Sequence, residues 1–471
     1  MTDQTAPADR CDVAIVGAGI TGLATAHFLA RRGLRVRIVE AQERAGGAIR
    51  TSHQGGFQIE HGPNSLLDTD PVLHELFETI GIADELIYAS DEAKNRYIVR
   101  DGRLHPLPMS PPGLIKSDLF STRAKLRLMI EPFVGRGPAD VEETLADFVE
   151  RRLGREFMEY AIDAFVAGVY AGVPQKLSVR EAFPKLFALE ENYGSILKGA
   201  ILGARKRRKE GRTSKQSARM FSFKKGLQTI VDGLVRQREG ELELSTRLTG
   251  VRQEEDGYAL DLVCGDEQRQ LKTRSVLLTV PVEAYEQLEF SFDFDAPRQA
   301  LQQIYYPPVS MVFCGFEKKP EGRELDGFGF LIPTVEQRQI LGTIWSSSLF
   351  PGRAPEGGIA LTTFVGGSRQ PENARWEEEE LVDAVHGDLR DLLGIEARPD
   401  LVFVQRWEKA IPQYQLGHRQ LIAELEKCET ENPGLYLGGN FRGGISVADC
   451  ITQSQKLAER IGEETKGAAE Q

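Results

Sequence analysis

The sequence lacks any run of about 20 consecutive apolar residues, which is the length that a membrane-spanning helix needs. Its N-terminal residues, MTDQTAPADRCD, also lack the charged and then apolar pattern of a signal peptide. We therefore predict a chain without a membrane span, for which any membrane contact is peripheral.

Close pairs of cysteine and an excess of basic residues are absent as well. The five cysteines lie far apart, so neither a metal site nor a disulfide framework is predicted, and reduced thiols are typical of a cytoplasmic protein. The 58 basic and 70 acidic side chains give a formal net charge of −12, which disfavours generic nucleic-acid binding. The length of 471 residues and a hydrophobic content of 41% predict a globular protein of two or three domains.

The most informative stretch runs from Val13 to Glu40 and reads VAIVGAGITGLATAHFLARRGLRVRIVE. It predicts a strand, a glycine turn, a helix and a second strand that ends in an acidic residue. In a dinucleotide-binding unit, Gly17 permits the turn, Gly19 lets the backbone approach a pyrophosphate, and Gly22 lets the helix pack closely. The helix N-terminus at Ile20 and Thr21 offers free N–H groups to the anion, and Glu40 is expected to accept hydrogen bonds from a ribose. The glycine pattern alone is weak, but its place between a strand and a helix makes it specific.

A second glycine pair follows in the segment 43–51, ERAGGAIRT, where a dehydrogenase of the NAD type would usually continue into its next helix. This segment resembles the FAD-binding amine oxidase superfamily, whose members place such a segment beside the flavin pyrophosphate. A glycine hairpin with solvated arginines is the alternative. The motif HGPNS at residues 61–65 then resembles the superfamily's loop beside the flavin ring, although a simple turn would read the same way.

Further along, the chain resembles the protoporphyrinogen and coproporphyrinogen oxidase family of that superfamily. The resemblance rests on NRYIV at 95–99, IKSD at 115–118 and GVYAGVP at 168–174, and it extends over essentially the whole chain. Val173 stands where the family often has aspartate, so no role is assigned to that side chain.

The resemblance implies an α/β fold: a Rossmann-like FAD-binding domain, a mixed-sheet substrate domain and an inserted helical membrane-associating lobe. The FAD-binding domain is expected at 10–88, 216–289 and 431–471, the substrate domain at 89–109 and 290–430, and the helical lobe at 110–215. The lobe ends in a basic run, residues 204–212, that is either a solvated loop or a contact with anionic lipid headgroups.

The resemblance also assigns residues to the cofactor FAD. The expected FAD-binding residues are Gly17, Gly19, Ile20, Thr21, Gly22, Glu40, Ala41, Arg44, Gly46, Gly47, Ala48, Gly62, Pro63, Asn64, Leu248, Thr279, Trp407, Gly439, Asn440, Ser446 and Val447. Backbone N–H groups near Ser446 and Val447 are expected to face the flavin pyrimidine.

For the substrate, Arg96 is expected to hold a propionate of a tetrapyrrole, because a guanidinium suits a carboxylate. Gly168 and Gly172 are expected to shape the cavity, and Phe330, Leu331 and Trp345 to wall it. A solvated arginine and ordinary core aromatics are the alternatives. No side chain is assigned as a general acid or base.

The implied activity is the oxygen-dependent oxidation of protoporphyrinogen IX to protoporphyrin IX in haem biosynthesis, by three rounds of hydride transfer to flavin with peroxide release. Coproporphyrinogen III oxidation is the first alternative, an amine or carotenoid flavin oxidase the second, and a non-catalytic binder on the same fold the third. The expected partners are the tetrapyrrole, O2 and the inner face of the cell membrane, with a homodimer left open and no nucleic acid.

Overall fold

The computed structural model describes residues 10–91, 93–138, 141–210 and 218–467. Three segments that are far apart in the sequence build one eight-stranded sheet, in the order β10-β2-β1-β13-β12-β11-β14, with β20 paired to β13. Its strands are β1 (Arg10–Val16), β2 (Val36–Val39), β10 (Leu242–Glu243), β11 (Thr246–Glu254), β12 (Gly257–Cys264), β13 (Glu267–Leu278), β14 (Glu289–Phe290) and β20 (Leu435–Leu437). Because β1 pairs in parallel with both β2 and β13, the carboxyl ends of these strands lie at one edge of the sheet.

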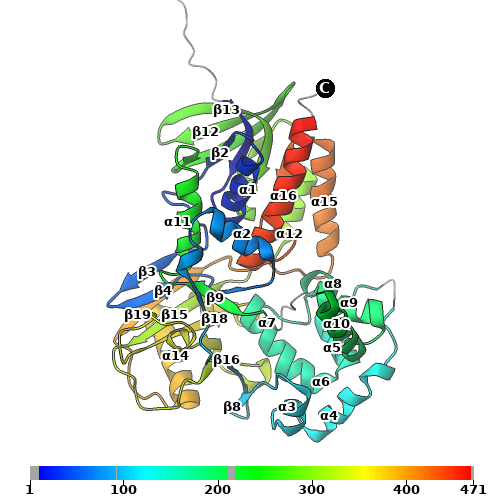
Figure 1. The fold of residues 1–471 in the computed structure, drawn as a ribbon, viewed down its shortest axis with the longest axis vertical. Helices are drawn as coiled ribbons and strands as arrows, with labels where there is room; N and C mark the ends of the chain where they lie inside the picture. Colours follow the sequence, from blue (N-terminus) through cyan, green and yellow to red (C-terminus); the bar gives the residue numbers. More distant parts are fainter. Residues whose placement is uncertain (1–9, 92, 139–140, 211–217, 468–471) are drawn as a thin grey trace, which may run out of the picture.

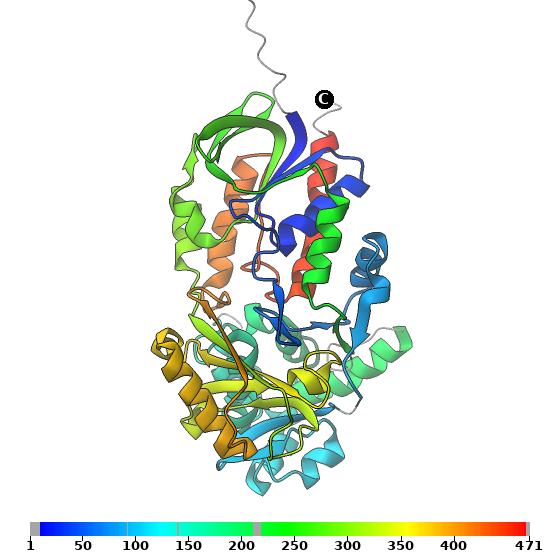
Figure 2. The ribbon, with the colours of Figure 1, turned by 90° about the vertical axis from the view of Figure 1, so that its left-hand side faces the viewer.

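Alternation along β1 divides the apolar core of this half between two faces. Val13 and Ile15 pack with one set of helices, while Ala14 and Val16 pack on the opposite face. The helices of the first face are α1 (Ile20–Arg31), α2 (Pro71–Thr79), α11 (Gln228–Gln237) and α16 (Val447–Gly467); those of the second are α12 (Asp295–Gln303) and α15 (His418–Glu431). We call this part the eight-stranded half; it lies above the other sheet along the long axis of the molecule (Figures 1 and 2).

The second large sheet has seven strands in the order β19-β15-β18-β17-β16-β7-β8. They are β7 (Asn95–Arg100), β8 (Arg103–Pro106), β15 (Val309–Phe316), β16 (Gly327–Leu331), β17 (Ile340–Ile344), β18 (Ile359–Gly366) and β19 (Leu401–Trp407). Its first hairpin, β7–β8, turns at Asp101 and Gly102, both of which have positive φ, the conformation that Asp-Gly favours in a tight turn.

One face of the seven-stranded sheet is covered by α14 (Glu378–Leu393), which packs Leu381, Val385 and Leu389 against it. Register places Arg96 of β7 beside Gly329 of β16, and Leu331 lies two residues further along the same strand. Because side chains alternate, Arg96 and Leu331 share the face opposite α14. That face is turned toward the eight-stranded half and the helical lobe.

The helical lobe carries α3 (Pro111–Lys116), α4 (Thr122–Met129), α5 (Leu145–Arg152), α6 (Arg155–Phe157), the π-helix η3 (Met158–Ile162), α7 (Asp163–Tyr170), α8 (Val179–Ala182), α9 (Pro184–Tyr193) and α10 (Ile196–Glu210). In Figure 1 it extends to one side of the seven-stranded sheet. The side chains of the basic run at 204–212 lie outside the described residues. Among the helices that the structure describes, none combines the length and apolar character that crossing a bilayer requires.

Smaller elements join the halves. A hairpin of β3 (Thr51–Gln54) and β4 (Phe57–Glu60) and a small sheet of β5 (Leu66–Leu67), β9 (Met220–Phe223) and β6 (Leu86–Tyr88) connect them. The remaining short helices are η1 (Ala83–Glu85), η2 (Glu131–Phe133), η4 (Val282–Glu286), η5 (Thr334–Glu336), α13 (Ser346–Leu349) and η6 (Pro371–Arg375).

The structure differs from the expected division of the chain at two helices. Ala300 and Leu301 of α12 and Ile422 and Leu425 of α15 belong to the core of the eight-stranded half, although both helices fall in the segment expected for the substrate domain, 290–430. The reason is packing: each helix buries its apolar face against the first sheet.

Candidate active site

The first glycine loop of the βαβ unit closes with tight backbone contacts. Gly17 has φ of +103° and its N–H donates to the Val39 carbonyl (2.8 Å). A Cβ added to Gly22 would lie 2.0 Å from the Gly17 carbonyl oxygen, so α1 packs against the loop only because this position is glycine. At Gly19, by contrast, an added Cβ would meet nothing within 4 Å, so the backbone there opens onto free space.

The N-terminus of α1 faces this space. Gly19 precedes the helix without a side-chain cap, the first turn has no acidic residue, and within the described chain the N–H groups of Ile20 and Thr21 have no acceptor. A helix start of this kind attracts an anion such as a phosphate.

Glu40 ends β2 with its carboxylate held in place. Its Oε2 accepts from the Ala18 N–H (2.7 Å) and its Oε1 from the Gln42 N–H (2.9 Å). Each oxygen keeps a further lone pair, so the carboxylate can still accept a hydroxyl beside the glycine loop. Leu248 lies two residues after Thr246, whose N–H donates to the Glu40 carbonyl (2.8 Å), so the predicted Leu248 stands near this corner.

The second glycine pair lies against the first loop. The Gly46 N–H donates to the Ala18 carbonyl (2.8 Å), and Gly46 forms a bridge with Gly19. Arg44 donates to three carbonyls of this turn, those of Ala45, Gly47 and Ile49. Its described hydrogen bonds therefore shape the turn. The Thr279 hydroxyl donates to the carbonyls of residues 16 and 17 and so stabilises the first glycine loop.

The loop at residues 61–64 passes beside both halves. Gly62 must be glycine, because an added Cβ would lie 2.4 Å from the Ala48 carbonyl oxygen. Trp407 of β19 fixes the loop by donating from Nε1 to the His61 carbonyl (3.0 Å), and Asn64 donates back to the Gly62 carbonyl (3.1 Å). Pro63 lies between Gly62 and Asn64 in this loop. Outside the loop, Ala41 follows Glu40 and is exposed.

The C-terminal turn is held by a tyrosine that sequence analysis did not assign to the site. The Tyr414 hydroxyl donates to the Asn440 carbonyl (2.6 Å) and accepts from the Gly444 N–H (3.1 Å). Gly439 precedes this turn with positive φ. Burial raises the pKa of Tyr414 well above its usual value, so its hydroxyl stays protonated. Its partners lie 26 and 30 residues away in the sequence, so no local pattern marks the contact.

Ser446 caps the next helix, α16, by accepting from the Asp449 N–H (3.1 Å). Val447 then begins a helix that lies beside α1, since the Ser454 hydroxyl of α16 donates to the Thr21 carbonyl (3.1 Å). Two helix N-termini therefore open toward the same region of the molecule (Figure 1).

On the seven-stranded sheet, Arg96 lies on the face opposite α14, which we call the Arg96 face. Its side chain is exposed, and surrounding protein lowers the pKa of its guanidinium by desolvation. The guanidinium lies 5.9 Å from the centroid of the Phe328 ring, and no ion pair of Arg96 occurs among the described residues. A charged donor without a carboxylate partner is available for a ligand.

Helix α7 packs against the Arg96 face at Leu331. Gly168 is required for packing, because an added Cβ would lie 2.3 Å from Leu331 Cδ2. Gly172 is closed off in the same way by Gln413, whose Oε1 would lie 2.3 Å from an added Cβ. Phe165 and Val169 occupy the same helical stripe, with exposures of 43% and 41%. Sequence reasoning missed these two residues, although their spacing from the glycines places them on one face.

Two expected wall residues lie elsewhere. Phe330 is 2% exposed and Trp345 is 0% exposed, and both belong to the core under α14, with Tyr97 5.6 Å from the Trp345 ring. Their assignment to the cavity is corrected: both side chains point to the face opposite Arg96. Leu331, the next residue in β16, lies on the Arg96 face, and its assignment to the cavity wall stays a prediction.

The residues around Gly17, Gly22, Glu40 and Gly46 fit a dinucleotide, because the open backbone at Gly19 and the free N–H groups of α1 form a cradle with room for a diphosphate. Together with the loop at 61–64 and the second helix N-terminus at Val447, they define a flavin-dependent oxidoreductase site.

Comparison with known proteins agrees with this class. Residues 20–462 match the model of the family described as flavin containing amine oxidoreductase. The chain is 34% identical to protoporphyrinogen oxidase 2 of Arabidopsis thaliana, with 95% of this chain and 93% of the relative covered. It is 29% identical to coproporphyrinogen III oxidase of Bacillus subtilis, with 94% and 96% covered.

A crystal structure from Exiguobacterium sp. 255-15 matches with a TM-score of 0.81 at 26% identity, covering 97% of this chain and 99% of that chain. The chain belongs to the flavin-containing amine oxidoreductase family, in the branch that holds the protoporphyrinogen and coproporphyrinogen oxidases, and its cofactor is FAD.

Proposed function

We propose that this protein oxidises protoporphyrinogen IX to protoporphyrin IX with FAD as its cofactor and O2 as the final acceptor. The single observation that carries the proposal is the Arg96 face: an exposed guanidinium, without a carboxylate partner among the described residues, shares this face with Leu331. Helix α7 packs against Leu331 and exposes the apolar side chains of Phe165 and Val169. A tetrapyrrole with propionate arms and an apolar ring system matches both features.

In this proposal Arg96 binds a propionate by charge-assisted hydrogen bonds and so fixes the orientation of the macrocycle. Phe165, Val169 and Leu331 contact the ring and exclude water from the space between Arg96 and the cofactor loop. Gly168 and Gly172 let α7 approach Leu331 and Gln413 closely enough to close that space. When bound, FAD supplies the two-electron acceptor and passes the electrons on to O2.

The cofactor assignments follow from the cradle. The N–H groups at Ile20 and Thr21 are proposed to bind the diphosphate, Glu40 the adenosine ribose, and the N-terminus of α16 at Ser446 and Val447 the flavin pyrimidine. Arg44, Thr279, Trp407 and Asn440 are proposed to hold these loops in shape, because their described contacts are with loop backbone or neighbouring side chains.

Coproporphyrinogen III is the second candidate substrate. It is supported by the likeness to the Bacillus subtilis relative, which covers 94% of this chain at 29% identity. Protoporphyrinogen is preferred because the exposed stripe of α7 is apolar at Phe165 and Val169. A ring with extra propionates would leave carboxylates against that apolar surface, at a cost in binding.

We also propose that the helical lobe touches the inner face of the cell membrane. Large apolar side chains of neighbouring elements in the lobe are exposed, and they are Met109, Ile115, Leu126, Met129, Ile130, Phe133, Ile201 and Leu202. The Lys198 ammonium stands 5.9 Å from the Phe133 ring centroid, so a cation accompanies the most exposed aromatic side chain of this set. Apolar side chains with an adjacent cation are typical of an interfacial surface.

The deciding experiment is anaerobic mixing of the flavin-replete protein with protoporphyrinogen and, separately, with coproporphyrinogen. Flavin bleaching is followed first, and porphyrin fluorescence after oxygen is admitted. Faster bleaching by protoporphyrinogen supports the proposal. Faster bleaching by coproporphyrinogen would make coproporphyrinogen the substrate instead. Bleaching by neither would refute the porphyrinogen assignment.

A further inference from the structure

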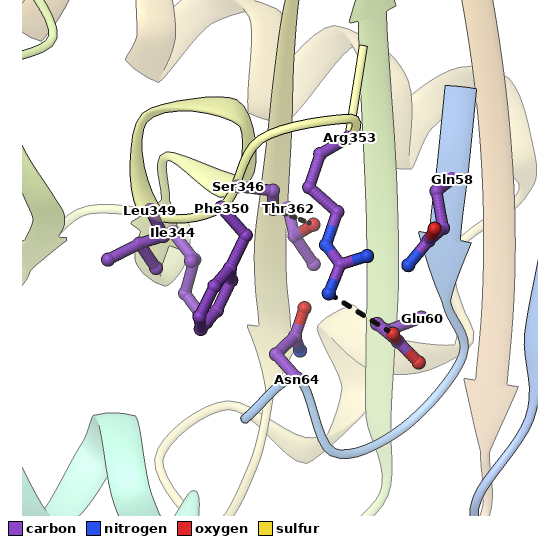
Figure 3. Close-up of a pocket in the computed structure, with 9 residues that line it drawn as sticks. All are labelled: Gln58, Glu60, Asn64, Ile344, Ser346, Leu349, Phe350, Arg353 and Thr362. Atoms are coloured by element: carbon purple, nitrogen blue, oxygen red, sulfur yellow. Dashed lines mark hydrogen bonds and ion pairs between the residues drawn. The ribbon is translucent and has the colours of Figure 1, made fainter. Parts of the chain in front are cut away.

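A small cavity lies between β4 of the β3–β4 hairpin and the loop after α13. About 10 Å³ is open to the centre of a water molecule, which is close to the space that one buried water needs. The residues that line it are Gln58, Glu60, Asn64, Ile344, Ser346, Leu349, Phe350, Arg353 and Thr362 (Figure 3).

Two buried donors at this cavity lack an acceptor. Arg353 is 2% exposed; its Nη2 donates to the Ser222 hydroxyl (2.8 Å) and lies 3.9 Å from Glu60 Oε1, whereas its Nη1 has no partner within the described chain. Gln58 is 3% exposed, and its Nε2 also has no hydrogen-bond partner in that part of the chain, although the amide is near enough to the Glu60 carboxyl to lower its pKa. In Figure 3 the guanidinium and the amide point toward the same space.

Unpaired buried donors are costly, and a guanidinium more so than a neutral group. The Gln58 amide could turn its oxygen toward Arg353, but it would then lose the contact of Oε1 with His53 Nε2 (3.2 Å) in the tautomer that donates. One acceptor placed between the two donors satisfies both without that loss.

We propose that this cavity binds one small hydrogen-bond acceptor, a water molecule or a chloride ion, held by Arg353 Nη1 and Gln58 Nε2. For a water molecule, the Glu60 carboxyl and the Asn64 amide provide acceptors for its two hydrogens. For chloride, the positive charge of Arg353 provides the attraction, and the neighbouring Glu60 carboxyl opposes it when ionised. The site includes neither Arg96 nor the glycine cradle, and it meets the expected cofactor site only at Asn64 of the loop at 61–64.

Crystals of the FAD-loaded protein, grown without chloride and then soaked in bromide, test the proposal. Anomalous scattering within hydrogen-bond distance of both donors identifies the halide form. A full peak without anomalous scattering at the same place identifies the water form. An empty cavity in which the Gln58 oxygen bonds Arg353 directly overturns the proposal, and so does a peak that contacts only one of the two donors.

Two substitutions at Gln58 provide a second readout in solution. Gln58→Leu removes one donor, and we expect loss of the occupant and a lower melting temperature than in Gln302→Leu, which changes an exposed glutamine of α12. Gln58→Glu keeps an acceptor for His53 and places a carboxylate beside Arg353, so we expect loss of the occupant without that loss of stability. Retention of the occupant in Gln58→Glu would contradict the proposal.

Discussion

Replacing Arg96 separates ligand binding from folding. No ion pair of Arg96 occurs among the described residues, so Arg96→Ala leaves no buried carboxylate unpaired. We expect the thermal unfolding of the variant to match that of the wild type. In the complex, by contrast, Arg96→Ala removes charge-assisted hydrogen bonds worth about 1.5–3 kcal/mol, which corresponds to a loss on the order of 10- to 100-fold in kcat/KM.

The assay is the initial rate of porphyrin fluorescence over a range of porphyrinogen concentrations, with flavin content checked for each variant. Arg96→Lys keeps the charge but not the planar fork, so it should fall between the wild type and the alanine variant. Arg103→Ala is the matched control, because Arg103 is exposed in the same β7–β8 hairpin. Equal losses for Arg96→Ala and Arg103→Ala, or an unchanged kcat/KM, would refute the role of Arg96.

Three further predictions concern the cofactor loop, a buried carboxyl and the helical lobe. Gly22→Ala places a Cβ 2.0 Å from a loop carbonyl, so the purified protein should carry little FAD by absorbance, whereas Gly387→Ala, with nothing within 4 Å, should keep it. Burial raises the pKa of Glu60 from 4.5 to about 7, so its native state binds the proton more tightly and stability is lost as pH rises between these values. Glu60→Gln should therefore gain stability over the wild type from about pH 5 to about pH 8, by up to about 3 kcal/mol in denaturant titrations; a gap that narrows with pH would contradict this. Arg152→Met leaves the buried Glu131 without its cation and should lower the stability by about 3–5 kcal/mol. Arg155→Met removes only an exposed ion pair and should change the stability little, since the two arginine side chains are 0% and 79% exposed; equal melting temperatures would refute this.

The sequence predicted local structure well where the residues of a short pattern determine the conformation by themselves. The strand, glycine turn and helix from Val13 onward form as expected, because Gly17 needs positive φ and Gly22 needs close approach. The hairpin at Asp101 and the long helix α14 likewise have local causes, the turn residues of the one and the apolar periodicity of the other.

Contacts between elements that are far apart in the sequence could not be predicted from it. The periodicity of α12 and α15 shows that each helix has an apolar face, but not which sheet receives it, and both pack on the eight-stranded half. The contacts of Arg152 with Glu131 and Glu190, each far away in the sequence, leave no pattern that spacing could reveal. The same holds for Tyr414, which reaches Asn440 and Gly444 only through folding.

The sequence could not predict which face of the sheet each residue of β16 occupies. Phe330 and Leu331 are neighbours in β16, so one of them must face α14 and the other must face Arg96. In a sheet with one solvated face, polarity would settle the choice, but here both faces are covered and both residues are apolar. Only the pairing of Arg96 with Gly329 decides it, because that register places Leu331 on the side of the charge. A cavity wall in such a sheet is therefore predicted reliably only when one charged residue fixes which face of the strand belongs to the ligand.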